Sequence, residues 1–255
     1  MDRPTLTRTR LSHVGSTAVL TLASDKVNAL DLELLRELPV VVEYCEQSPE
    51  VTALVLTGEG SVFSAGLNVN EILANEASHS ALVLGALGDA LLAIFACPLP
   101  TVVAVNGAAI AGGALLACAF DTRLMADAAR IGVTELKVGV AFPVLTVELL
   151  KHVCGPAAES VMFGAGLLDA DAARATGLAH RALPREELAG AAIAEAERLA
   201  ALDPRAYALA KASARRSVLS AVADEGGRQI DRQVLDHWQD DLTRSNLERL
   251  LAPKR

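Results

Sequence analysis

Residues 101–121, TVVAVNGAAIAGGALLACAFD, constrain the fold more than any other part of the chain. The first five form an apolar, β-branched run typical of a buried strand, and the run ends at Asn106-Gly107. The pair Gly112-Gly113 then begins an apolar helix. A helix that starts on glycine beside a strand end presents free backbone N–H groups and the positive end of its dipole. This arrangement suits a developing negative charge.

The same segment lacks the features of nucleotide-binding loops. The glycine pair is followed by Ala-Leu, whereas a phosphate-binding loop has Lys-Ser or Lys-Thr, and the glycine spacing is not that of a dinucleotide fingerprint. We therefore expect an oxyanion at this helix start and not a nucleoside triphosphate.

The composition favours one large core. Hydrophobic residues make up 52% of the 255 residues, which suits one domain with an appendage. The chain has 23 basic and 31 acidic residues with no basic cluster, so we expect no nucleic-acid partner. The N-terminus lacks an apolar signal core and no apolar stretch approaches the ~20 residues of a membrane span, so we expect no membrane partner.

The four cysteines, Cys45, Cys97, Cys118 and Cys154, lie far apart and form no C-x-x-C pair. Such residues are typical of reduced core positions in a cytosolic protein, so the expected localisation is cytoplasmic. The histidines have no spacing suited to a metal, and we expect no metal site.

Strand and helix patterns alternate along the chain. A hairpin is predicted around Gly15-Ser16, and Asp31 is expected to cap a helix that Pro39 could interrupt. The expected strands are 5–12, 17–23, 51–57, 101–105, 123–126 and 131–133. The expected helical stretches are 70–96, 169–175, 185–202, 204–219 and 224–251.

A strand followed by a glycine-rich turn occurs at 53–66 and again at 102–113. This recurrence predicts stacked β-β-α turns in an α/β fold. From Pro156 onward the pattern is almost wholly helical. The last amphipathic stretch is typical either of a helix that packs on a partner subunit or of a solvated capping helix.

Four motifs together resemble the crotonase superfamily of acyl-CoA enzymes. They are VNAL (27–30), ALVLTGEGSVFSAGLNVNEI (53–72), VNGAAIAGGALLACAFD (105–121) and GVTELKVGV (132–140). The resemblance implies a crotonase-like spiral of ββα units that binds acyl-CoA over 1–195, and a helical oligomerisation region over 196–255. It also implies a homotrimer or hexamer and an acyl-CoA thioester substrate, with no cofactor because CoA is part of the substrate.

In that superfamily two backbone N–H groups bind the thioester oxygen. By motif position these are the N–H groups of Leu67 and Gly112. The resemblance also implies that Ala65 and Gly66 line the substrate site. Lys26 is expected either at the CoA phosphates or adenine, or as a solvated turn residue.

The hydratases of the superfamily use two glutamates, and here the first position is Leu115 while the second is Glu135. Losing a positioned acid–base group costs ~10²–10⁴ in rate, so efficient hydration is disfavoured. One carboxylate suffices for a 1,3-proton shift from C2 to C4 of a 3-enoyl thioester. VNAL, VFSAGL and the GV-x-x-P motif at 139–143 resemble the mitochondrial-type Δ3,Δ2-enoyl-CoA isomerases more than the hydratases.

The predicted roles follow from these residue types. Glu135 is the single acid–base, and its apolar sequence neighbours are expected to raise its pKa towards a useful range. Leu115 is expected to line the substrate site and exclude water.

Two departures from the superfamily pattern leave alternatives open. Asn68 stands where the family usually has Asp, so a local hydrogen bond could differ. Side branches of the superfamily place their base elsewhere, and Glu71 and His79 are the candidates here, although both positions are more typical of solvent-facing helix residues. Glu148 is a poorer candidate.

Three rival functions are compatible with the resemblance. The first is an enoyl-CoA hydratase-like lyase of low efficiency. The second is a thioester hydrolase with Ser64 as nucleophile, which is disfavoured because no histidine lies nearby in sequence to activate it. The third is a non-catalytic acyl-CoA-binding protein, against which the retained Glu135 argues.

Overall fold

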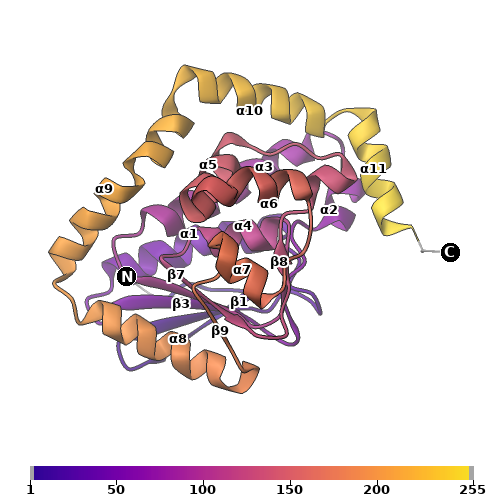
Figure 1. Cartoon of the computed structure of the whole chain (residues 1–255). Helices are drawn as coiled ribbons and strands as arrows, with labels where there is room; N and C mark the ends of the chain where they lie inside the picture. The colour runs from indigo at the N-terminus through magenta and orange to yellow at the C-terminus, as the bar shows by residue number, and fades with distance from the viewer. Residues whose placement is uncertain (1–2, 253–255) are drawn as a thin grey trace.

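The computed structural model describes residues 3–252, which form two β-sheets surrounded by helices (Figure 1). The strands are β1 Thr9–Val14, β2 Thr17–Leu22, β3 Ala53–Gly58, β4 Val62–Ser64, β5 Thr101–Val105, β6 Ala108–Ile110, β7 Thr122–Ala126, β8 Ile131–Gly132 and β9 Arg181–Leu183. The α-helices are α1 Leu32–Gln47, α2 Val69–Ala74, α3 His79–Ala96, α4 Gly112–Cys118, α5 Val144–Cys154, α6 Ala158–Gly164, α7 Ala170–Thr176, α8 Arg185–Ala200, α9 Pro204–Ala223, α10 Glu225–Trp238 and α11 Asp241–Leu251. Two short 3₁₀ helices are η1 Glu135–Val138 and η2 Gly155–Ala157.

The sheet topology confirms the predicted stacking of β-β-α turns. The larger sheet has the order β1-β2-β3-β5-β7-β9, and the smaller has the order β4-β6-β8. Only the β1–β2 hairpin is antiparallel among the paired strands of the described residues. In the pairs β3–β4, β5–β6 and β7–β8, the first strand joins the larger sheet and the second joins the smaller one. The chain therefore advances as a spiral.

The central strand β5 is buried along its whole length, as its continuous apolar sequence predicts for a parallel strand. Helix α8 packs on strands β3, β5 and β7 of the larger sheet. Phe63, Phe95 and Phe120 are among the largest fully buried side chains. Burial of these residues supplies the hydrophobic stabilisation that holds the spiral together.

Two asparagines of the sequence motifs fix the turns between the sheets. The Asn106 side chain accepts a hydrogen bond from Gly58 N at 3.0 Å and donates one to Gly60 O at 3.0 Å. Asn28 Nδ2 donates to two carbonyls at either end of the β3–β4 turn. These bonds fix the turn before β4 and so position β4 and the residues after it, where the FSAGL motif (63–67) lies.

The C-terminal helices wrap around the rest of the molecule. Figure 1 shows α9, α10 and α11 running along successive outer sides of the core. The expectation of one helical stretch over 224–251 is wrong, because Asp240 caps a separate helix α11 by accepting from Thr243 N at 2.6 Å. The stretch 70–96 likewise divides into α2 and α3.

Helix α3 is long and apolar enough to cross a membrane by length and composition, which the sequence analysis did not expect. In the structure it packs along α1 and buries Val83, Leu87, Leu91 and Phe95. A core helix meets the same criterion, and this packing is that of a core helix. The facing helix α1 continues through Pro39, which lies inside it.

Asp121, shortly after α4, connects the core to α9. Its carboxylate accepts from Lys211 Nζ at 2.9 Å, from Tyr207 Oη at 2.8 Å and from the Arg215 guanidinium. The two cationic side chains are only 7% and 6% exposed, so their charges depend on this one carboxylate for compensation.

Candidate active site

A cavity of about 280 Å³ lies between the spiral core and the C-terminal helices. Of the residues that the sequence analysis selected, five line it: Ala65, Leu67, Gly112, Leu115 and Glu135. The remaining lining residues are Val69, Leu84, Leu87, Ile110, Ala111, Thr134, Val138, Val140, Ala141, Phe142, Pro143, Thr146, Trp238, Leu247 and Leu250. The lining is therefore mostly apolar, as in sites for small organic ligands.

Two backbone N–H groups meet at one side of the cavity. Within residues 3–252, neither Leu67 N nor Gly112 N donates a backbone hydrogen bond. Gly66 has φ +89°, and a Cβ there would lie 2.8 Å from Ile110 O and 3.2 Å from Gly112 N. A Cβ on Gly112 would lie 3.5 Å from Leu67 N. Only glycine at 66 permits this close approach, which places the two donors as neighbours.

Hydrogen bonds on both sides of Leu67 hold its N–H in place. Leu30 N donates to Gly66 O at 2.8 Å, and Asn68 N donates to Leu30 O at 3.0 Å. The VNAL motif is thus the strand-like partner of the segment that carries the first donor.

The second donor follows a strained residue. Ala111 has φ 51° and ψ −122°, a conformation that costs a non-glycine residue of order 1–3 kcal/mol. Its N–H donates to Gly132 O at 2.9 Å, and its carbonyl accepts from Leu115 N at 3.0 Å. The fold therefore holds the start of α4 in an unfavourable backbone geometry next to Gly112, as is common at functional sites.

Glu135 is the titratable group of the cavity. It begins η1, is only 8% exposed, and its Oε2 has no hydrogen-bond partner among the described residues. Burial raises the pKa of Glu135 to about 7, against which hydrogen bonds to backbone N–H groups act in the opposite direction. Of its apolar sequence neighbours, Ile131 and Val133 are fully buried, whereas Leu136 is exposed. A carboxyl group with this pKa can take and return a proton near neutral pH.

Leu115 lies in the first turn of α4 and is 2% exposed. Among the lining residues that the structure describes, Glu135 is the only one with a carboxyl group. The cavity thus combines one carboxyl group, two backbone donors and the apolar side chain of Leu115.

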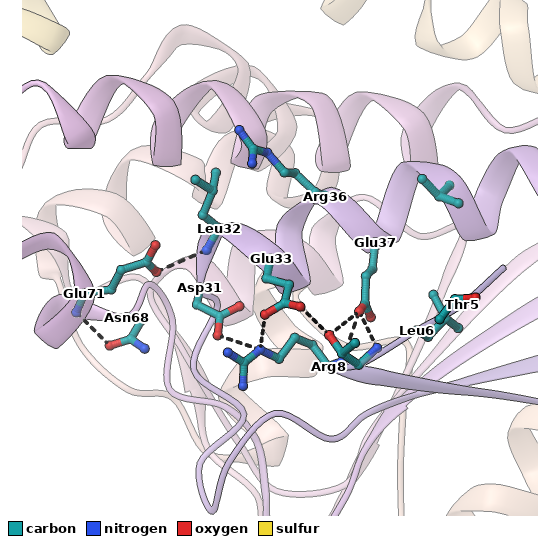
Figure 2. Close-up of a pocket in the computed structure, with 12 residues that line it drawn as sticks. Thr5, Leu6, Arg8, Asp31, Leu32, Glu33, Arg36, Glu37, Asn68 and Glu71 are labelled. Atoms are coloured by element: carbon teal, nitrogen blue, oxygen red, sulfur yellow. Dashed lines mark hydrogen bonds and ion pairs between the residues drawn. The ribbon is translucent and has the colours of Figure 1, made fainter.

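The alternative bases Glu71 and His79 do not line this cavity. They are not solvent-facing either, which corrects the expectation, because Glu71 Oε1 lies 2.9 Å from His79 Nε2 and their side chains are 21% and 16% exposed. Glu71 also accepts from Leu32 N at 3.1 Å, a bond that Figure 2 shows. Glu148 forms an ion pair with Lys151 at 2.8 Å on α5.

A second hollow, of about 790 Å³, has Glu71 in its lining. Figure 2 shows the residues that line it. Its carboxylates are occupied by protein partners: Glu37 accepts from the backbone N–H of Thr7 and Arg8, and Glu33 pairs with Arg8 Nε at 2.9 Å. These contacts join α1 to the chain segment before β1. Among residues 3–252, no three His, Cys, Asp or Glu side chains come together as a set of metal ligands.

Three further sequence candidates have positions outside the cavity lining. Ser64 is fully buried and its Oγ donates to Asn28 O at 2.8 Å, so it is occupied in holding the turn. Asn68 Oδ1 accepts from Glu71 N at 3.1 Å and caps α2. Asparagine at this position, where the superfamily usually has aspartate, therefore still caps the helix. Lys26 is exposed in the turn after β2, next to Val27, whose carbonyl accepts from Ala65 N.

The individual lining residues from distant segments were not identified from the sequence. Ile110 and Phe142 lie within or beside recognised motifs, but Trp238, Leu247 and Leu250 come from α10 and α11. No local pattern predicts that these helices fold back over the cavity.

Comparison with known proteins places the chain in a family. Residues 13–249 match the family model described as enoyl-CoA hydratase/isomerase. The chain is 30% identical to human mitochondrial enoyl-CoA delta isomerase 1 over 93% of this chain and 81% of that protein. It is 36% identical to a putative enoyl-CoA hydratase of Thermus thermophilus over 77% of this chain and 79% of the relative.

The crystal structure of human mitochondrial Δ3,Δ2-enoyl-CoA isomerase superposes with a TM-score of 0.90 at 27% identity, covering 96% of this chain and 97% of that one. This match confirms the crotonase-like fold. The chain belongs to the enoyl-CoA hydratase/isomerase family.

Proposed function

We propose that the protein converts a 3-enoyl-CoA into the 2-trans-enoyl-CoA by a one-carboxylate 1,3-proton transfer. The observation that carries this proposal is the cavity with one carboxyl group, Glu135, beside the free N–H groups of Leu67 and Gly112. The family acts on acyl-CoA thioesters, and both a hydratase and an isomerase are among the relatives.

In the first step, the ionised Glu135 carboxylate takes a proton from C2 of the substrate. The electron pair left by the C–H bond delocalises through the thioester and the C3=C4 double bond, forming a dienolate. The N–H groups of Leu67 and Gly112 donate to the thioester oxygen, where negative charge develops. Preorganised donors of this kind are worth about 10²–10³ in rate each.

In the second step, the Glu135 carboxyl group returns the proton to C4. The double bond then lies between C2 and C3, conjugated with the thioester, and the carboxylate is restored. The substrate and product have the same composition, so the reaction consumes no water and needs no cofactor beyond the CoA that belongs to the substrate.

Leu115 supports isomerisation over hydration. Hydration requires a positioned group that activates water, and this buried leucine can neither donate nor accept a proton. An apolar side chain beside the dienolate also excludes water from it. We propose that Lys26, exposed near the Ala65 segment, contacts the CoA portion outside the cavity.

The test gives purified protein a 3-enoyl-CoA and, in parallel, a 2-enoyl-CoA. Absorbance of the conjugated thioester should rise with the first substrate and change little with the second. Glu135→Gln should abolish the rise, whereas Glu148→Gln, which removes a carboxylate in an ion pair outside the cavity, should retain it. Hydration without isomerisation would favour the low-efficiency hydratase, and acyl-CoA binding without either reaction would favour a binding protein.

A further inference from the structure

The C-terminal helices complete the cavity with apolar side chains of the same chain. Helix α10 supplies Trp238, and α11 supplies Leu247 and Leu250. Trp238 and Leu247 are 8% and 3% exposed, while Leu250 is 51% exposed. Trp238 therefore provides a large and buried part of this wall.

The indole of Trp238 is held in place by the segment that it faces. Its Nε1 donates to Ala141 O at 2.9 Å. Ala141 also lines the cavity and lies six positions after Glu135. A buried indole that satisfies its N–H in this way has little freedom to move aside for a ligand.

Two neighbouring contacts attach α10 to the same segment. His237 Nε2 lies 2.9 Å from Gly139 O, and Asp231 accepts from Val144 N at 2.8 Å. Helix α10 thus contacts residues 139–144 at three backbone positions, directly after the helix that carries Glu135. These contacts consequently hold Trp238 at a fixed position relative to the carboxyl group of Glu135.

Trp238 and Glu135 line the same cavity, so its volume limits the ligand that can contact both. The cavity of about 280 Å³ has to hold the thioester and the reacting carbons as well as the acyl tail, because Leu67, Gly112 and Glu135 line the same space. Apart from Thr134, Glu135 and Thr146 its side chains offer few polar groups, so the matching guest for the remaining space is an aliphatic chain of limited length.

We propose that Trp238 is the specificity-determining residue that limits the length of the acyl chain, restricting the site to short and medium aliphatic acyl groups. The kinetic test of this inference rests on the proposed function, because it measures turnover of 3-enoyl-CoAs whose acyl chain lies in this cavity. It also has a binding test that needs no turnover.

The binding test uses the wild-type protein and its only tryptophan. Saturated acyl-CoAs of increasing chain length, which cannot isomerise, are titrated while tryptophan emission is recorded. Emission should respond to chains long enough to reach the indole and remain unchanged with CoA or acetyl-CoA. Emission that stays unchanged for every bound chain length would overturn the proposal.

The kinetic test compares kcat and KM for 3-enoyl-CoAs of increasing length. In the wild type, kcat/KM should fall about tenfold or more at the first chain that is too long by one methylene. Trp238→Leu should move this limit to longer chains, mainly by lowering KM for them. Trp238→Phe should move it less, because replacing the indole by a phenyl ring frees less space than replacing it by leucine. Ile230→Ala, at an exposed position of the same helix, should keep the wild-type limit.

A folded Trp238→Leu protein with the wild-type chain-length limit would overturn the proposal. If that variant does not fold, Trp238→Phe and the emission titration decide. If the wild type isomerises no 3-enoyl-CoA at all, the proposed function fails, and the series of saturated acyl-CoAs still tests the role of Trp238.

Discussion

Replacing Glu135 by glutamine should change stability in a pH-dependent way. Burial raises the pKa of Glu135 from 4.5 to about 7 in the folded protein. Between these values the folded chain keeps a proton that the unfolded chain has lost, so the free energy of unfolding of the wild type falls as pH rises. Each pH unit between the two pKa values is worth about 1.4 kcal/mol. About two of these units lie above pH 5, and the titration is gradual near each pKa, so the contribution lost between about pH 5 and pH 8.5 is about 2.5 kcal/mol.

Glu135→Gln removes this titration and leaves the other ionisable groups in place. The quantity to compare is the free energy of unfolding of the variant minus that of the wild type, from urea unfolding at one protein concentration. It should be more positive at about pH 8.5 than at about pH 5 by about 2.5 kcal/mol. Taking the difference cancels the cost of fitting an amide into the site.

Glu148→Gln is the matched control, because its carboxylate lies in an ion pair outside the cavity, with a side chain 24% exposed. Its stability difference should change far less between the two pH values. An equal difference for Glu135→Gln at both pH values would refute the reasoning that burial holds the proton on this group.

Three further predictions concern rate and stability. The wild-type kcat/KM for a 3-enoyl-CoA should rise with pH and level off above about pH 7, because Glu135 must be ionised to take the proton; a pH-rate profile that is flat from about pH 5 to 9 would contradict this role. Gly66→Ala should lower kcat/KM by about 10²–10³, because its φ of +89° and the nearby Ile110 carbonyl would force the segment that carries the Leu67 N–H to move. Initial rates at subsaturating substrate measure kcat/KM, and an unchanged value would argue against the oxyanion site. Asp121→Asn should destabilise the fold by about 3–5 kcal/mol, because it leaves Lys211 and Arg215 buried without a counter-charge; urea unfolding at neutral pH measures this, and a loss below about 1 kcal/mol would refute it.

Local patterns predicted the elements that depend on neighbouring residues. The apolar run before Asn106 forms a buried strand, and Gly112 begins a helix, because both follow from backbone geometry and burial. The terminal helix was misjudged, since its amphipathic pattern continues across the break and only the cap at Asp240 marks it. A single capping residue within a long periodic pattern is easily overlooked.

The site was predictable where motifs carry it and unpredictable where packing does. Leu67, Gly112, Leu115 and Glu135 were selected from motif positions, and all four line one cavity. The contribution of Trp238 depends on how α10 folds back on the core, which sequence periodicity does not specify. The pairing of Glu71 with another helix was missed for the same reason.

The most direct test of the central claim follows the transferred proton. A 3-enoyl-CoA labelled with deuterium at C2 is converted by the wild type, and the position of the label in the product is determined by NMR. If Glu135 moves the proton within a site that excludes water, part of the deuterium should appear at C4, and Glu135→Gln should show no turnover. Undiminished turnover by Glu135→Gln, with C4 protonated entirely from solvent, would contradict the one-carboxylate mechanism.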